Sequence, residues 1–190
     1  NDPMVRFFVR EPEDRGLSAS IFQGIMETDT EYFVNMDCDF QHPPSAVGDI
    51  CQKLNDGADL CIGIREKRTA LSPIRWLASW GAHFMAVLTL WLRNKRKSSD
   101  IMSGLFGGRT GIFKKVIEDN SHNFEMKGFK ALYDLMKFAP ENIVVEEVEF
   151  EFGTRQGGES KLSKVVILSV IKQSEPFGKA ISEMTTRLNR

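Results

Sequence analysis

Two aspartates one residue apart, Asp37 and Asp39, are the residues of this chain best suited to chemistry. They follow the apolar run 32–36 and precede Pro43 and Pro44. A strand that ends in two carboxylates before a loop offers oxygen ligands to Mg²⁺ or Mn²⁺, which usually share their shell with phosphate. Because open α/β sheets bind ligands at the carboxyl ends of their strands, we expect a metal-assisted enzyme acting on a nucleotide diphosphate compound. Solvated turn residues are the alternative, since Asp-x-Asp is a short pattern.

The composition is typical of one soluble globular domain. The chain has 190 residues, of which 42% are hydrophobic and 27% charged. Its net charge of -1 gives no footprint for nucleic acid, so we expect no nucleic-acid partner. The odd number of cysteines, without Cys-x-x-Cys spacing, predicts a reducing compartment and neither a disulfide framework nor a zinc site. We expect Cys38, Cys51 and Cys61 to be small core or strand-end residues, and no apolar leader follows Asn1.

Apolar periodicity predicts alternating strands and helices, typical of a mainly parallel α/β sheet. We expect strands at 4–9, 31–36, 58–64, 105–107 and 143–152, and helices at 16–26, 44–55, 124–137 and 162–173. Along the last strand, Glu147, Glu149 and Glu151 alternate with apolar residues, which predicts a solvated face. The domain is expected to span residues 1–173, and the polar residues 174–190 to form a tail.

Residues 73–92 are almost entirely apolar. Their most polar side chains, Arg75, Ser79 and His83, are spaced by four and would lie on one stripe of a helix. A buried core helix, a membrane span and an interfacial helix are all compatible with this pattern. Tryptophans at both ends and the basic cluster 93–97 favour an interfacial amphipathic helix over 73–97.

Six motifs follow one another at characteristic spacings. They are Arg-Gly-Leu at 15–17, Met-Asp-Cys-Asp-Phe-Gln-His-Pro-Pro at 36–44, Gly-Ile-Arg at 63–65, Asp-Ile-Met-Ser-Gly-Leu-Phe at 100–106, Gly-Phe-Lys at 128–130 and Phe-Gly-Thr-Arg-Gln-Gly-Gly-Glu-Ser-Lys-Leu-Ser at 152–163. Each is weak alone, but together they resemble glycosyltransferase family 2, and within it the dolichyl-phosphate mannose synthase (polyprenyl-phosphate glycosyltransferase) group. The resemblance extends to about residue 173.

The resemblance implies a GT-A fold, a Rossmann-like and mostly parallel sheet flanked by helices. It implies an inverting enzyme that uses Mg²⁺ or Mn²⁺ to move a hexose, with mannose from GDP-mannose favoured, onto dolichyl or polyprenyl phosphate. Such an enzyme would be cytoplasmic and peripheral on the cytoplasmic face of a membrane surface. Two alternatives stay open: transfer of glucose or an aminosugar to undecaprenyl phosphate, and a non-catalytic module that binds lipid phosphate.

The same resemblance suggests a metal site and catalytic residues. Asp37, Asp39 and Gln41 match the family's metal-binding positions, and Asp37 would thereby contact the nucleotide-sugar donor. Asp39, Arg65 and Arg155 are the expected catalytic residues.

An acceptor site is implied in the same way. Arg65, Arg75 and Ser79 match positions that hold the lipid phosphate. Arg155 matches a loop that closes over donor and acceptor, and Lys161 follows it as a further substrate-binding residue.

The chain also departs from the family pattern. It lacks the family's Pro-x-Tyr-Asn-Glu and Asp-Asp-Gly-Ser strands, which grip the nucleotide. A degenerate form is one explanation, but the intact later motifs favour an amino-terminally truncated domain with exposed strand edges. Cys38 replaces the usual alanine between the two aspartates. Arg109, after two glycines, is open to either a phosphate contact or a structural role.

Overall fold

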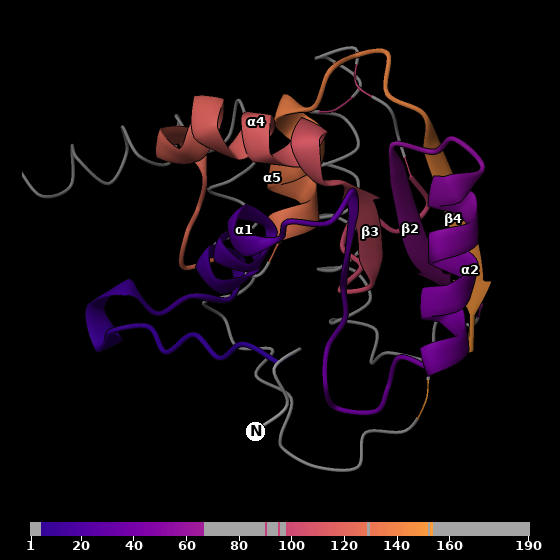
Figure 1. Cartoon of the computed structure of the whole chain (residues 1–190), viewed down its shortest axis with the longest axis horizontal. Coiled ribbons are helices and arrows are strands. Elements are labelled where there is room, and N and C mark those ends of the chain that lie inside the picture. Colours follow the sequence, from indigo (N-terminus) through magenta and orange to yellow (C-terminus); the bar gives the residue numbers. More distant parts are fainter. Residues whose placement is uncertain are drawn as a thin grey trace, which may run out of the picture.

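Four strands form a single mixed sheet. The computed structural model describes residues 5–66, 90, 95, 98–128, 130–151 and 153. Its strands are β1 (Tyr32–Asn35), β2 (Leu60–Arg65), β3 (Phe106–Arg109) and β4 (Val145–Phe150), in the order β1-β3-β2-β4. β2 and β4 pair in parallel, whereas β3 runs antiparallel to both β1 and β2 (Figure 1). Thus β1, β2 and β4 point the same way, as predicted, and β1 and β4 lie at the edges of the described sheet. The reversed strand β3 between them was not predicted.

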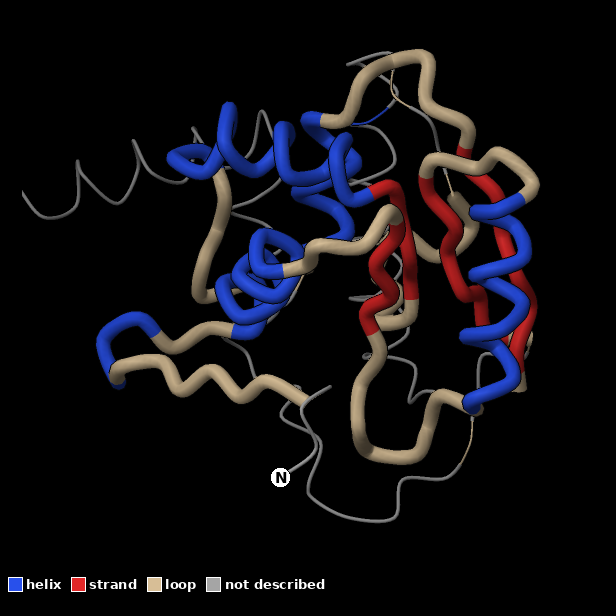
Figure 2. The backbone as a smooth tube through the Cα atoms, in the orientation of Figure 1, coloured by secondary structure: helices blue, strands red, loops and turns tan. Residues whose placement is uncertain are grey.

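Helices cover both faces of the sheet. They are α1 (Leu17–Glu27), α2 (Pro44–Asn55), α4 (Thr110–Asn120) and α5 (Ala131–Phe138), with short 3-10 turns at Pro12–Asp14 and Ser121–Asn123. α2 lies on one face, and α1, α4 and α5 gather on the other (Figures 1 and 2). Prolines precede and open α2, where a missing N–H costs nothing, and the expected bounds 44–55 are confirmed.

Each face of the sheet has its own apolar core, because side chains alternate along each strand. On the face of α1, α4 and α5 the core includes Phe22, Phe33, Leu60, Ile62, Phe106, Phe113, Leu132 and Leu135. On the face of α2 it consists of Ala46, Ile50, Leu54, Ala58, Cys61, Leu105, Val148 and Phe150. Burying each large apolar side chain in this way contributes about 1.5–3 kcal/mol to the stability of the fold. The two cores therefore hold the strands and the covering helices together.

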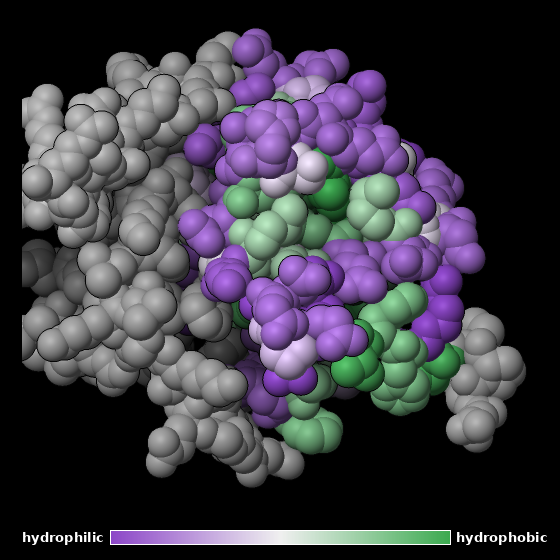
Figure 3. All heavy atoms as spheres, turned by 90° about the vertical axis from the view of Figure 1, so that its left-hand side faces the viewer, coloured by the Kyte–Doolittle hydropathy of each residue, from purple (hydrophilic) through white to green (hydrophobic). Residues whose placement is uncertain are grey.

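Two predicted elements are wrong in the structure. Residues 5–9, expected as a strand, form no regular element, and Phe7 and Val9 are each 89% exposed. Figure 3, which views the molecule from the side where α1 and α4 lie, shows apolar side chains at the surface among hydrophilic ones. The predicted helix 124–137 begins only at Ala131.

The late start of α5 has a physical cause. The loop before it accepts hydrogen bonds from the first turn of α1, whose N–H groups have no partner within their own helix. The N–H groups of Ser18 and Ala19 donate to the carbonyl oxygens of Gly128 (3.1 Å) and Met126 (3.1 Å). A Cβ at Gly16 would overlap the Met126 carbonyl, which accounts for the glycine in the Arg-Gly-Leu motif.

Several expectations concern parts of the chain outside the described residues. These are the interfacial helix at 73–97, of which Leu90 and Lys95 alone are described, the helix at 162–173 and the tail 174–190. The buried Leu90 belongs to the core on the α1 face. Within the described ranges, no helix has the length and apolar character needed to cross a membrane.

Replacing Gly107 by alanine should destabilise the fold. A Cβ there would lie 2.8 Å from both Ile50 Cγ2 and the Phe33 carbonyl oxygen, and the latter is backbone of the neighbouring strand. We expect Gly107→Ala to lower the free energy of unfolding by roughly 1–3 kcal/mol, measured by urea denaturation. The control is Gly48→Ala within α2, where a Cβ meets nothing within 4 Å and should stabilise by up to ~1 kcal/mol. Equal effects of the two substitutions would contradict this account of the packing.

Candidate active site

The carboxyl ends of three strands meet at one edge of the sheet. The loop from Asp37 to Gln41 follows β1, Arg65 ends β2, and Gly153 lies just beyond β4. Figure 1 shows the loop between β1 and α2 at the lower edge of the sheet, where the arrow of β4 also ends. This edge is where open α/β sheets bind their ligands, and it brings together the described residues that were predicted to act.

The aspartate loop is held in a tight conformation. The Gln41 N–H donates to Asp39 Oδ1 (3.2 Å), and Phe40 between them has a φ of 63°, a left-handed value that is uncommon for a non-glycine residue. Asp37 lies against Gly104, where an added Cβ would come within 2.8 Å of Asp37 Oδ2. Glycine at position 104 therefore leaves the space in which the Asp37 carboxylate sits.

His42 supports the loop from beneath. It is buried, its ring packs edge-on against Phe150 with centroids 5.4 Å apart, and its Nδ1 accepts the Asp37 N–H (3.2 Å). Burial lowers the pKa of His42, although the Asp37 and Asp39 carboxylates act in the opposite direction. A neutral ring can accept this hydrogen bond. His42 belongs to one of the sequence motifs, but the motif does not reveal this supporting role.

The end of β4 is tied to the same loop. The Gly153 N–H donates to the Gln41 carbonyl (2.9 Å), and Gln41 Nε2 donates to the Gly153 carbonyl (3.3 Å). Gly153 therefore lies beside Gln41 of the aspartate loop. The predicted Arg155 and Lys161, like Arg75 and Ser79, lie outside the described ranges.

Arg65 is oriented by a buried carboxylate. Its Nε and Nη2 donate to Asp100 Oδ2 at 3.1 and 2.9 Å, and Asp100 is 4% exposed. The side chain of Lys130 lies near this pair. Burial lowers the pKa of Lys130, Asp100 raises it and Arg65 lowers it further. The sequence motifs contained Asp100 and Lys130 but gave no role to either.

The aspartate loop suits a hard divalent cation. Asp37 and Asp39 provide carboxylate oxygens and Gln41 an amide oxygen, the ligand types that Mg²⁺ and Mn²⁺ prefer. Among the described residues, no group of three His, Cys, Asp or Glu side chains could hold a metal on its own. A cation here would therefore depend on the amide, water and a phosphate-bearing ligand to complete its shell.

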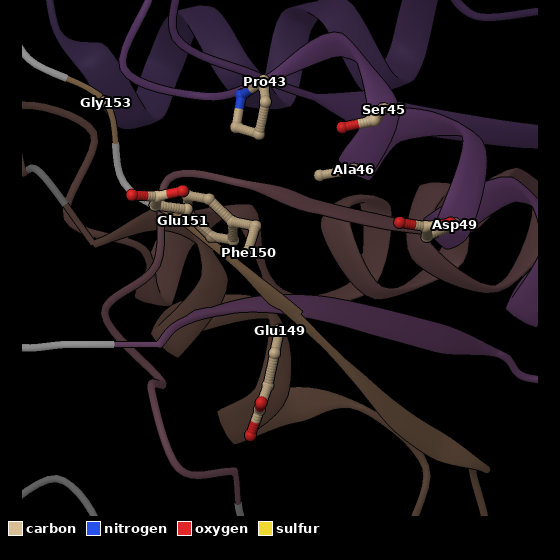
Figure 4. A pocket seen from close by; sticks show the side chains of 8 residues that line it. All are labelled: Pro43, Ser45, Ala46, Asp49, Glu149, Phe150, Glu151 and Gly153. Atoms are coloured by element: carbon tan, nitrogen blue, oxygen red, sulfur yellow. The ribbon is translucent and has the colours of Figure 1, made fainter.

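A neighbouring cavity is a poor candidate for the same chemistry. It has a volume of about 500 Å³ and lies between the start of α2 and the end of β4 (Figure 4). Three carboxylates line it, those of Asp49, Glu149 and Glu151. Their negative charge would repel a phosphate group, so the cavity volume does not identify the phosphate site.

Arg109 is a structural residue. Its guanidinium pairs with Glu31 (2.8 Å) and Asp59 (3.2 Å) and lies over the ring of Tyr32, 5.1 Å from the centroid. Arg109 aligns with Tyr32, at the start of β1, so it is at the end of the sheet opposite to Asp37. This geometry decides between the two roles that the sequence left open.

Known proteins resemble this chain in sequence. It is 34% identical over 175 residues to the dolichol-phosphate mannosyltransferase of Mycosarcoma maydis, covering 89% of this chain and 56% of that protein. It is 35% identical over 179 residues to the dolichol-phosphate mannosyltransferase of Saccharomyces cerevisiae, covering 89% and 62% respectively. The chain thus spans a little over half the length of these relatives, which bear the name of the group that its motifs resemble.

Solved structures resemble it in fold. Glucosyl-3-phosphoglycerate synthase from Mycobacterium tuberculosis, in complex with phosphoglyceric acid, superposes with a TM-score of 0.53 at 12% identity. The match covers 88% of this chain and 55% of that one, and it confirms the predicted α/β fold. Residues 1–119 match the glycosyl transferase family 2. Because this match covers more than half of the chain, the chain belongs to glycosyl transferase family 2.

Proposed function

We propose that this chain is the acceptor-binding and metal-binding part of a glycosyltransferase that moves a sugar from a nucleotide-sugar onto dolichyl or another polyprenyl phosphate. One observation carries the proposal: a loop with two aspartates and an arginine anchored on a buried carboxylate lie at the same sheet edge. The names of the relatives support the acceptor. GDP-mannose is the proposed donor and mannose the transferred sugar.

Arg65 would receive the acceptor phosphate. A phosphate monoester is already an anion near neutral pH, so it needs no general base, only neutralisation and orientation. The planar guanidinium grips phosphate oxygens through two N–H groups and so aims the nucleophile. Arg75 and Ser79 would share this task from the predicted interfacial helix 73–97, which would place the protein peripherally on the cytoplasmic face of a membrane. Attack from the face opposite the leaving group would invert the anomeric carbon.

Asp37, Asp39 and Gln41 would hold the divalent cation. When bound, Mg²⁺ or Mn²⁺ stabilises the charge that develops on the leaving diphosphate. The synthase from Mycobacterium tuberculosis, similar in fold, was solved with Mn²⁺ and uridine-diphosphate-glucose, which supports a cation in this fold. The space beside Gly104 lets the Asp37 carboxylate occupy its position in the loop.

Arg155 and Lys161 would act from the segment after β4. Because Gly153 is hydrogen-bonded to Gln41, that segment begins next to the metal loop. We propose that Arg155, two residues further along the chain, would contact both anions, the donor diphosphate and the acceptor phosphate. Arg155 would therefore compensate their mutual repulsion, and Lys161 would add a second cation.

Transfer of radiolabelled mannose from GDP-mannose to dolichyl phosphate in the presence of Mn²⁺ tests the proposed reaction. The complete gene product should put label into the lipid phase. The isosteric variant Asp39→Asn should lower the rate about 10²–10³-fold, the usual loss for one electrostatic contact to a developing charge. The matched control is Asp49→Asn, a carboxylate on α2 outside the aspartate loop, which should leave the rate unchanged.

Other donors and acceptors separate the alternatives. Transfer from UDP-glucose or to undecaprenyl phosphate, without transfer from GDP-mannose to dolichyl phosphate, would assign the protein to the sister activity. Binding of a polyprenyl phosphate without transfer from any donor would show a non-catalytic module and overturn the enzymatic proposal.

Thiol labelling tests the metal site without turnover. Cys38, between the two aspartates, and Cys51, on α2, are both exposed, whereas burial raises the pKa of Cys61 to about 11. At pH 8 iodoacetamide should label the first two thiols, and Cys61 only after denaturation. Mn²⁺ with GDP should slow the labelling of Cys38 but not of Cys51, as read by mass spectrometry, and a chelator should restore it. Equal rates with and without metal would count against a cation on the aspartate loop.

A further inference from the structure

Glu147 on β4 accepts three hydrogen bonds. Ser98 Oγ donates to its Oε1 (2.6 Å), the Ser99 N–H donates to the same oxygen (2.6 Å), and Ser99 Oγ donates to Oε2 (2.8 Å). Burial raises the pKa of Glu147, but these hydrogen bonds outweigh it and hold the pKa below its usual value. The predicted solvated row is therefore wrong at this position, while Glu149 and Glu151 are exposed as expected.

The hydrogen bonds of Glu147 continue toward the active site. Ser98 Oγ, which donates to Glu147, also accepts the Asp100 N–H (3.2 Å). Asp100 in turn accepts two hydrogen bonds from Arg65. Ser98 and Asp100 are 8% and 4% exposed, so water competes little for the hydrogen bond between them. An unbroken path thus leads from Glu147 to the guanidinium of Arg65.

The turn that carries Asp100 is hydrogen-bonded to two strands, β4 and β2. On the β4 side its partner is Glu147. Toward β2, Ser103 Oγ donates to the Gly63 carbonyl (2.6 Å), and the Ser103 N–H donates to the Asp100 carbonyl (3.0 Å). Glu147 is paired with Ile62 in the sheet, three positions before Arg65 on the same strand. The hydrogen bonds to β4 and to β2 therefore fix Asp100 relative to β2, the strand that ends in Arg65.

Asp100 needs this support because its position decides where Arg65 points. The Arg65 side chain is 38% exposed, and an arginine at a strand end would otherwise sample many rotamers. A buried carboxylate that accepts both Nε and Nη2 restricts the guanidinium to one orientation. A binding group must be held within about 0.5 Å of its productive position, which requires its supporting residues to be fixed as well.

We propose that Glu147 is a positioning residue for the acceptor phosphate: through Ser98 it fixes Asp100, and through Asp100 it aims the guanidinium of Arg65. This inference rests on the proposed function of Arg65. The turn 98–103 thereby becomes part of the acceptor site although Glu147 itself touches no substrate.

The test compares Glu147→Gln with Glu149→Gln in the complete gene product. Both residues are on β4, and Glu149 is exposed, so the pair differs chiefly in the contacts to Ser98 and Ser99. In Glu147→Gln the KM for dolichyl phosphate should rise about tenfold, the effect of ~1.4 kcal/mol, with kcat and the KM for GDP-mannose changed less than about twofold. Glu149→Gln should leave all three unchanged. A loss confined to kcat, or equal shifts in both variants, would overturn the proposal.

A second measurement needs no turnover. Hydrogen exchange of the Arg65 Nε–H, followed by NMR after ¹⁵N-arginine labelling, should be slow in the wild type and in Glu149→Gln. It should be several-fold faster in Glu147→Gln and in Ser98→Ala, a smaller change that breaks the same path. Unchanged exchange at Arg65 in both Glu147→Gln and Ser98→Ala would overturn the proposal that Glu147 orients Arg65. If the wild type neither transferred sugar nor bound polyprenyl phosphate, the proposed function would be refuted instead. The exchange rates would still show whether Glu147 orients Arg65.

Discussion

The arrangement of the site depends on the pairing of the short strand β3 with its two neighbours. It pairs with β1 on one side and β2 on the other, so it sets the distance between the aspartate loop and Arg65. Its glycines permit this, because Gly107 lies against Ile50 of α2 and Gly108 lies against Phe113 of α4. Side chains at these positions would push the covering helices away from the sheet. The close packing of helices on both faces of the sheet depends on the two glycines of β3. The nearness of the aspartate loop to Arg65 depends on the pairing of β3 with β1 and β2.

Ligand binding and support are assigned to different residues. The residues proposed to touch ligands, Asp37, Asp39 and Arg65, lie at or just after the ends of strands, as expected for a site at the carboxyl ends of a sheet. The residues that orient them are buried, one directly after the aspartate loop and the other 35 positions from Arg65. His42 holds the backbone of Asp37, and Asp100 holds Arg65. Buried polar groups of this kind are stable only when their partners are complete, and both of these have partners in the structure.

Local sequence patterns predicted much of this architecture. The features that were missed depend on contacts between residues far apart in the sequence. The helix 44–55 and the strand before the aspartates followed from prolines and apolar runs, which act within a few residues. The direction of β3 did not, because a four-residue strand has no local signal for its partner. The start of α5 was missed because α1 competes for the same backbone carbonyls. Glu147 was read as solvated because alternation alone does not reveal serines 48 and 49 positions away.

The tie between Gln41 and Gly153 also bears on the order of folding. These residues are 112 positions apart in the chain, and closing so long a loop costs entropy that only prior assembly of the sheet can offset. β1, β3, β2 and β4 must already be in register before the two backbone segments meet. The aspartate loop would then reach its native shape late, after the cores have formed. Because β4 is the last of the four described strands to be synthesised, these strand ends would come together only after β4 has left the ribosome.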